Sequence, residues 1–585
     1  MKRFLKKWIF RLGVLTAVVI AGAAAILVYR VATKDRVPDR VILEADFQRH
    51  YVEQSARRGP ITWVTGRAPA LRTPVEALLR AATDDRVEGL VARVGGAMDM
   101  GKVQELRDAV LAFRRSGKKA VAWAESFAGA GSGNRAYYLA TAFDRVLLQP
   151  SGELALTGLH ARTPFLGELL KKAGVRPRLA KREEYKTAAN TVTQTEYTAP
   201  HREAQKALIQ SMMDQILEGI ASSRGVSEEE AASLVAGGPY LASEALERGL
   251  IDGLAYRDEV VSSIKEQAGD ETPLLPLPEY RRRAGSPYRG KNRIGLIYGV
   301  GRIVRGKSRR SPLGGHIMGS DTVCSAFRDA VKDDSIEAVV FRIDSPGGSY
   351  VASDAIRREV FRAREAGKPV IVSMSGVAAS GGYFVAVPAD RILAHPGTIT
   401  GSIGVLGGKM ITRELWNKLG IHWGAVSTHE NADLGSRTAD YTERQWACLQ
   451  ERLDEIYRDF LARVSEGREM GRAEVREAAR GRVWTGKDAL ALGLVDELGG
   501  LPQAVRAAKD AAGIPQEKPV GLALFPPRRT LWQQILGEGS RDGMNSLTLG
   551  PRLRQDVVTA ARLLREMEGG MRNEALWMGP PLQIE

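Results

Sequence analysis

The chain has 585 residues, 44% of them hydrophobic, a composition typical of a globular protein with two or three domains. Its net charge of +15 favours anionic partners such as a membrane surface, although an arginine-rich exterior alone would also account for it. No nucleic-acid-binding motif is present. Two cysteines exclude a disulfide framework and a four-cysteine zinc site, and no histidine spacing matches a metal site. The sequence therefore predicts no metal, no cofactor and no nucleic-acid partner.

The N-terminus has the pattern of a membrane anchor. A basic, cytoplasmic segment at 1–11 precedes an uncharged run at 12–29, and Arg30 closes the run. A helix of that length reaches about 27 Å, enough to cross the hydrocarbon core of a bilayer. The charge bias keeps the N-terminus in the cytoplasm and places the rest outside, as for a single-pass protein of a bacterial inner membrane with a periplasmic catalytic part. A cleaved signal peptide, cut near Ala23–Ala25, is the alternative.

The body of the chain contains one module twice. Residues 84–94 and 333–343 align without gaps and share five identical residues, and further matches follow downstream at similar offsets. The period near 245 residues is too long for a solenoid repeat and has the size of a domain. The sequence therefore predicts a duplicated domain, of which one copy can lose its chemistry while the other keeps it.

Strand-like and helix-like runs alternate within each copy. In the second copy a strand at 338–341 precedes a helix at 352–366 and another strand at 370–372. This alternation is typical of parallel β-α units and predicts the α/β class. The expected order is the basic segment, the anchor, an N-terminal domain, a linker, a C-terminal domain and an extension (1–11, 12–29, 40–265, 266–292, 293–515 and 516–585).

One serine stands out in the second copy. A strand is expected to end near Ser373, the small residues after it are expected to form a tight connection, and a helix is expected to begin near Ser380. The first N–H groups of a helix have no intrahelical acceptor and would stabilise an oxyanion. A second glycine-rich element, Asp344–Gly348, follows another strand and offers further N–H donors. Taken singly, each element also matches a helix cap or a turn.

A serine nucleophile needs a base, and the pattern alone does not identify one. His395 and His429 lie downstream of Ser380, but their spacing does not single out either of them.

Three motifs together resemble the signal peptide peptidase A family in its long, duplicated form. They are Ala379–Tyr383, Asp344–Gly348 and Thr400–Val405, and the resemblance covers roughly residues 40–515. It implies two tandem Clp protease/crotonase-like domains built from β-β-α units, preceded by one transmembrane helix.

The resemblance also implies the site. Ser380 would be the nucleophile, Lys186 of the first copy the base, and the N–H groups of Gly347 and Gly381 the oxyanion hole. The matching region of the second copy, 430–433, has no lysine, and Ser132 of the first copy would be a relic. Lys186 can act as a base only if burial lowers its pKa, which requires close contact between copies or subunits.

The expected activity is that of a serine endopeptidase with a Ser-Lys dyad that degrades signal peptides and other apolar peptides at the membrane. The family forms homo-oligomers, so a tetramer is expected, and the sequence leaves open which protomer supplies Lys186. Two alternatives remain: a crotonase-like acyl-CoA enzyme on the same scaffold, and an inactive, membrane-anchored peptide-binding scaffold.

Overall fold

The computed structural model describes most of the two predicted domains and short pieces beyond them (residues 22, 36–55, 68–96, 98–128, 133–310, 315–527, 576–577 and 583–584). The predicted anchor lies outside these residues apart from Gly22, and so does Ser132. Across these described ranges, no helix is long and apolar enough to cross a membrane.

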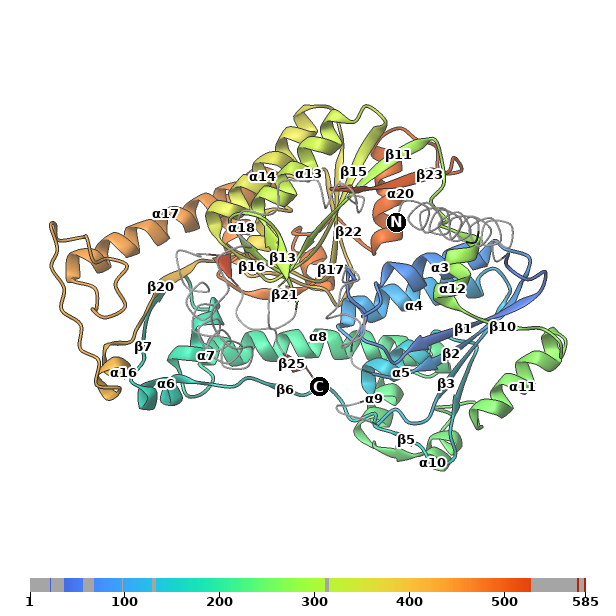
Figure 1. Cartoon of the computed structure of the whole chain (residues 1–585). Helices are drawn as coiled ribbons and strands as arrows, with labels where there is room; N and C mark the ends of the chain where they lie inside the picture. Colours follow the sequence, from blue (N-terminus) through green and yellow to red (C-terminus); the bar gives the residue numbers. More distant parts are fainter. Residues whose placement is uncertain are drawn as a thin grey trace, which may run out of the picture.

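The first copy is built on a six-stranded parallel sheet (Figure 1). Its order is β10-β1-β2-β3-β4-β9. The strands are β1 (Val41–Phe47), β2 (Val87–Val94), β3 (Lys119–Ala124), β4 (Arg145–Leu148), β9 (Gly253–Leu254) and β10 (Leu274–Pro276). The helices of this copy are α3 (Arg72–Ala82), α4 (Met100–Arg114), α5 (Asn134–Ala140), α6 (Gly167–Ala173), η1 (Thr187–Ala189), α7 (Asn190–Thr193), α8 (Ala199–Arg224), α9 (Glu228–Ala236), α10 (Ala242–Glu247), α11 (Arg257–Ala268) and α12 (Leu277–Ala284).

The second copy repeats this plan in an eight-stranded sheet with the path β21-β19-β17-β15-β11-β23, from which β18 and β22 branch at β17. The strands are β11 (Asn292–Val300), β15 (Ile336–Ser345), β17 (Val370–Ala379), β18 (Arg391–Ala394), β19 (Ile399–Gly401), β21 (Val483–Thr485), β22 (Glu497–Leu498) and β23 (Val520–Phe525). The helices are α13 (Ser320–Lys332), α14 (Tyr350–Glu365), α15 (Gly381–Phe384), α16 (Arg413–Lys418), α17 (Glu443–Arg468), α18 (Arg472–Ala478), α19 (Gly486–Ala491) and α20 (Leu501–Ala511). The α/β class with parallel sheets is therefore confirmed.

The central strands read as continuous apolar runs because the sheet is covered on both faces. Along β15, Val339 and Phe341 pack into the core on the face covered by α13 and α14. Ala338 and Val340, which point the other way, pack against α20.

Each copy ends with a strand that returns to the edge of its own first strand. β10 pairs with β1 in the first sheet, and β23 pairs with β11 in the second. The stretch 266–292, predicted as a linker, therefore contains β10 and the helix α12, which packs on α3. The sequence pattern placed the ends of both domains before these strands, because each strand is short and is separated from the preceding helix by only a few residues.

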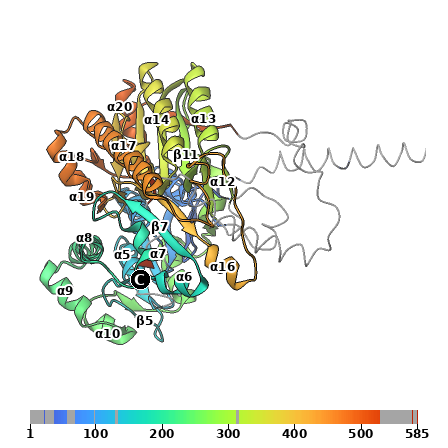
Figure 2. The ribbon, with the colours of Figure 1, turned by 90° about the vertical axis from the view of Figure 1, so that its left-hand side faces the viewer.

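The two copies are joined by more than the linker. The strand β7 (Arg176–Lys181) leaves the first copy and pairs antiparallel with β20 (Leu406–Ile411) of the second. The helix α17 runs along this two-stranded ribbon (Figures 1 and 2). The ribbon carries the segment after β7, which includes Lys186, onto the second copy.

Several short strands complete the structure. One small sheet has the order β13-β14-β12-β16-β24, and two-stranded pairs are formed by β5 with β8 and by β6 with β25. Their bounds are β5 (Glu153–Leu154), β6 (Ala161–Arg162), β8 (Tyr240–Leu241), β12 (Arg302–Val304), β13 (Arg309–Arg310), β14 (His316–Gly319), β16 (Gly347–Gly348), β24 (Leu576–Trp577) and β25 (Gln583–Ile584).

Candidate active site

Ser380 lies at the turn between β17 and α15, where the sequence predicts the start of a helix. β17 ends at Ala379 and α15 begins at Gly381, so the serine alone joins the strand to the helix. Its backbone has φ +56° and ψ −116°, a conformation that costs a non-glycine residue about 1–3 kcal/mol. The N–H of Ser380 donates to the carbonyl of Gly401 at 2.8 Å, which anchors the turn. A sharp, strained strand-to-helix turn is typical of a serine whose hydroxyl must stand clear of the sheet.

Lys186 comes from the first copy, and its segment packs directly on the second. The N–H of Tyr185 donates to the carbonyl of Arg480 at 3.2 Å. A Cβ built on Gly481 would lie 2.5 Å from the backbone nitrogen of Lys186, so glycine is required for this approach. Glu183 and Arg480, on the two sides of the contact, have φ values of +67° and +47°. The close backbone contact thus fixes where the lysine side chain starts.

The amine of Lys186 meets the hydroxyl of Ser380. The distance from Nζ to the Ser380 Oγ is 2.8 Å, and Nζ also donates to the carbonyl of Ser402 at 2.8 Å and to its hydroxyl at 3.0 Å. Lys186 is 1% exposed and Ser380 is fully buried. The structure thus brings the two predicted residues together within a single chain.

Burial lowers the pKa of Lys186 from 10.5 to about 7. The three hydrogen-bond partners of the amine are uncharged oxygens. They stabilise an ammonium group less than a carboxylate would, so they do not offset the loss of its hydration. At neutral pH a large fraction of this amine is therefore unprotonated and has a free lone pair.

The two glycine-rich elements also lie side by side. A Cβ built on Gly381 would lie 3.1 Å from the nitrogen of Gly348 and 3.3 Å from the Cα of Gly347. Gly381 is the first residue of α15, so its N–H has no intrahelical acceptor. The N–H of Gly347 donates to the hydroxyl of Ser345 at 3.2 Å. The structure therefore brings Gly347 and Gly381, the predicted oxyanion donors, together beside Ser380.

The family follows from comparison with known proteins. The model of peptidase family S49 matches residues 112–270 and 362–515, one segment in each copy. The chain belongs to peptidase family S49. It is 32% identical to the chloroplastic serine protease SPPA of Arabidopsis thaliana over 80% of this chain and 69% of that protein. It is 32% identical to Protease 4 of Salmonella typhi over 75% of this chain and 71% of that protein. A putative signal peptide peptidase SppA of Enterococcus faecium is 32% identical over 29% of this chain and 49% of that protein.

These relatives show that this S49 member is a serine peptidase of the long SppA type, as the sequence motifs predicted. The two matched segments also agree with the duplication seen in the two sheets.

Sequence reasoning missed Ser402, although it lies in a motif that carries the family resemblance. In this S49 peptidase both its carbonyl and its hydroxyl bind Lys186. Its φ is +54°, an unusual value for serine that turns both oxygens toward the same amine. The preceding Gly401, with φ +74°, shows that the chain bends sharply here. The signal available in the sequence was Gly401 at the end of a short strand, because a glycine in that position indicates a sharp turn.

The two histidines considered as bases lie elsewhere. His395 is buried near Glu105, 3.6 Å from its carboxylate, at the junction of the two copies. His429 is exposed in the extended segment between α16 and α17.

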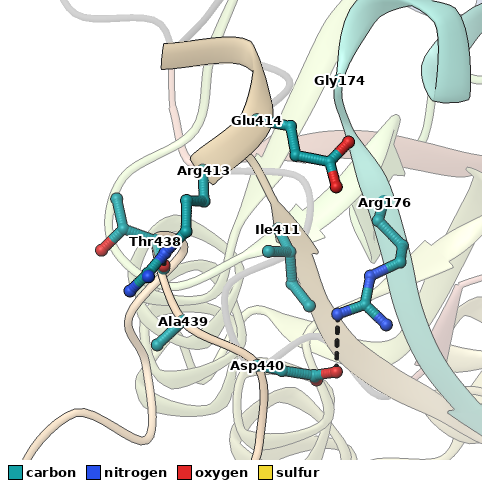
Figure 3. Close-up of a pocket in the computed structure, with 8 residues that line it drawn as sticks. All are labelled: Gly174, Arg176, Ile411, Arg413, Glu414, Thr438, Ala439 and Asp440. Atoms are coloured by element: carbon teal, nitrogen blue, oxygen red, sulfur yellow. Dashed lines mark hydrogen bonds and ion pairs between the residues drawn. The ribbon is translucent and has the colours of Figure 1, made fainter. Parts of the chain in front are cut away.

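An open pocket of this S49 peptidase lies at the opposite end of the β7–β20 ribbon from Lys186 (Figure 3). Arg176 and Asp440, which form an ion pair of 2.7 Å, line it together with Glu414 and Arg413. The ribbon from Arg176 to Lys181 is itself about 17 Å long, and Lys186 follows its far end. The pocket therefore does not belong to the candidate active site.

Proposed function

We propose that this chain is a membrane-anchored serine endopeptidase that uses Ser380 and Lys186 as a dyad to degrade cleaved signal peptides. The observation that carries the proposal is the 2.8 Å contact between Nζ and Oγ, at a place where burial lowers the pKa of the lysine to about 7. A neutral amine has two N–H donors and one lone pair. The carbonyl and the hydroxyl of Ser402 take the two N–H groups, which leaves the lone pair for the proton of Ser380.

Peptide cleavage would proceed through an acyl-enzyme. Lys186 takes the proton of the Ser380 hydroxyl while Oγ forms a bond to the peptide carbonyl carbon, whose oxygen becomes an oxyanion. The oxyanion then collapses, the C–N bond breaks, and the leaving amine receives the proton from Lys186. A water molecule next gives a proton to Lys186 and attacks the ester. Collapse of this second oxyanion releases a carboxylic acid and returns the proton to Ser380.

The oxyanion would be held by the N–H groups of Gly347 and Gly381. Their adjacency beside Ser380 supports this assignment. In the structure the hydroxyl of Ser345 accepts the N–H of Gly347, and a substrate oxygen would take over that place. The loss of one such donor typically costs about 3–4 kcal/mol of transition-state stabilisation.

An extended peptide would bind beside these glycines by strand addition. The chain's own β24 pairs antiparallel with β16, so that Gly347 lies opposite Trp577 and Gly348 opposite Leu576. This pairing supports the proposal, because it means that an extended backbone fits the edge that carries the proposed oxyanion hole. Main-chain pairing of this kind gives affinity, and side-chain pockets then give specificity.

Signal peptides are the proposed substrates because they are apolar segments left at the membrane. The predicted anchor at 12–29 would hold the catalytic part close to them, on the extracytoplasmic side of a bacterial inner membrane. The relative from Enterococcus faecium, named a putative signal peptide peptidase, agrees with this substrate class.

We also propose that the protein is a homo-oligomer, with a tetramer as the expected form. The segment between α16 and α17 projects from the body and exposes four large apolar side chains (Leu419, Ile421, Trp423 and Val426). Exposed apolar side chains that cluster in this way are typical of a surface covered by a partner. The dyad itself is complete within one chain, so the assembly would not be needed to supply Lys186.

The test is cleavage of an apolar peptide combined with labelling by a fluorophosphonate. The Ser380→Ala protein should neither cleave the peptide nor take up the label, and the Lys186→Ala protein should be equally inactive. Lys181→Ala is the matched control, since this half-buried lysine lies on the same segment and binds the carbonyl of Glu184 instead. Cleavage by Ser380→Ala at the parent rate would refute the proposal.

A further inference from the structure

An irregularity in β17 lies directly before the catalytic turn. Along β15 and β17, Ile343 pairs with Met374, but the next pair is Ser345 with Ala378. Residues 375–377 of β17 therefore stand opposite the single residue Asp344. Such a bulge bends its strand and redirects the side chains that follow it. The bulge ends three residues before Ser380, so its shape sets the direction in which the chain enters the catalytic turn.

The first copy packs its helix α4 onto this bulge. A Cβ built on Gly376 would lie 2.9 Å from a carboxylate oxygen of Asp99, the residue just before α4. A Cβ built on Gly101, in the first turn of α4, would lie 2.9 Å from the carbonyl of Ser375. A glycine on each side thus lets the two copies approach closely. The hydroxyl of Ser375 also donates to Glu53 of the first copy at 2.5 Å.

Asp344, on the neighbouring strand β15 of the second copy, binds the backbone of the bulge. One of its carboxylate oxygens accepts the N–H of Val377 at 3.2 Å, and the other lies 3.0 Å from Nζ of Lys102 in α4. Lys102 also donates to Asp99 at 2.7 Å. Its side chain is 7% exposed, so the positive charge is held inside the junction of the two copies. Burial raises the pKa of Asp344, and the charge of Lys102 acts against that rise.

Asp344 is connected to both halves of the proposed site. It lies three residues before Gly347, a proposed oxyanion donor, and it binds Val377, three residues before Ser380. A shift of this carboxylate would therefore move the nucleophile and the glycine loop together.

We propose that Lys102 is a positioning residue of the active site, through which the first copy holds Asp344 and the bulge of β17 in place. The inference rests on the proposed dyad function. It gives the first copy a second role beside that of supplying Lys186, because its helix α4 would also align the groups that the second copy contributes.

The test is a double-mutant cycle with Lys102→Met and Asp344→Asn. Lys102→Met should lower kcat by about 10–100-fold, the range expected when reacting groups are misplaced by roughly 1 Å. Asp344→Asn keeps an acceptor for the N–H of Val377 and should lower kcat by a smaller factor. The double variant should come close to Asp344→Asn alone, because Lys102 then keeps only its pair with Asp99, whose side chain is 52% exposed. Lys102→Arg, which keeps the charge, should retain most of the activity.

Two readouts separate positioning from general loss of structure. The concentration of active sites is counted by end-point fluorophosphonate labelling, so that kcat refers to folded enzyme. The pH midpoint of kcat/KM should stay at the parent value, because Lys186 is unchanged. The control is Lys118→Met, a partly buried lysine of the first copy that binds the carbonyls of Ala81 and Asp84. It should leave kcat unchanged.

Three results would overturn the inference: a parental kcat for Lys102→Met, effects of the two substitutions that simply multiply, or an equal loss in Lys118→Met. If Lys102→Met does not fold, an unchanged kcat in Asp344→Asn would overturn the inference instead. Failure of the proposed dyad would look different, since Ser380→Ala would then remain active.

Discussion

Replacement of Lys186 by methionine removes the buried amine but leaves a side chain of similar length. Folding lowers the pKa of this lysine from 10.5 to about 7, because burial disfavours the charged form. Each tenfold change in an ionisation constant corresponds to about 1.4 kcal/mol, so the buried lysine costs the folded parent up to about 5 kcal/mol. Methionine carries no such cost, and we expect the variant to be more stable than the parent near pH 6 although it is inactive.

The dependence on pH distinguishes this effect from changes in packing. Between about pH 7 and pH 10.5 the unfolded parent binds more protons than the folded parent, so the stability of the parent rises with pH in that window. Below about pH 7 the cost of the buried lysine is present in full. The advantage of Lys186→Met should therefore shrink by about 2 kcal/mol between pH 7 and pH 9. The hydrogen bonds that Lys186→Met loses are worth about 1 kcal/mol each. Their loss changes the stability difference between variant and parent by the same amount at every pH.

The assay is denaturant unfolding of Lys186→Met and of Ser380→Ala, which keeps the lysine, at pH 6, 7, 8 and 9. Ser380→Ala should follow the parent in its slope against pH. A stability difference between Lys186→Met and the parent that stays constant from pH 6 to pH 9 would show that the lysine is not desolvated, and the reasoning would be refuted.

Three further predictions concern the surroundings of the dyad. Gly481→Ala should lower kcat about 100-fold, because its Cβ would lie 2.5 Å from the backbone nitrogen of Lys186 and would push the lysine away; peptide cleavage measures this. Glu53→Gln should lower the free energy of unfolding by about 1.5–3 kcal/mol, because it weakens the bidentate pair with the buried Arg342 while Glu105 still pairs with that guanidinium; thermal unfolding measures this. Removal of residues 576–585 should lower KM for an added peptide, since β24 would no longer occupy the edge at β16; peptide titration measures this.

Matched controls exist for two of these changes. Gly513 has φ +67° and open space around its Cβ, so Gly513→Ala introduces similar backbone strain without a clash and should retain activity. Glu88 pairs with Arg40 at the surface, so Glu88→Gln should change stability by at most about 1 kcal/mol. An active Gly481→Ala, an equally stable Glu53→Gln, or an unchanged KM after the deletion would each contradict the corresponding prediction.

Local patterns were sufficient for the class of the fold and for the catalytic turn. The alternation of apolar runs and helical segments predicted a parallel sheet, and the helix expected near Ser380 begins at Gly381. Both features depend on neighbours in the chain, so the sequence displays them directly. The strand end expected near Ser373 was wrong, because the small residues that follow continue β17 as far as Ala379.

Contacts between distant segments were not accessible in the same way. Lys186 meets Ser380 across 194 positions, and only the family resemblance pointed to it among 84 basic residues. Ser402 and Lys102 bind the site through a carbonyl, a hydroxyl and an ammonium group whose partners are fixed by tertiary packing. The same holds for β10 and β23, whose strand character comes from pairing with a first strand more than 200 residues earlier.

The central claim is that a neutral Lys186 takes the proton of Ser380, and the rate of fluorophosphonate labelling as a function of pH tests it most directly. In the parent the rate should rise tenfold per pH unit below about pH 7 and then level off, as expected for a base whose pKa is about 7. In Lys186→Met the residual rate should be at least about 100-fold lower, and this midpoint should be lost. Labelling of Lys186→Met at the parental rate, or with the same midpoint, would contradict the claim.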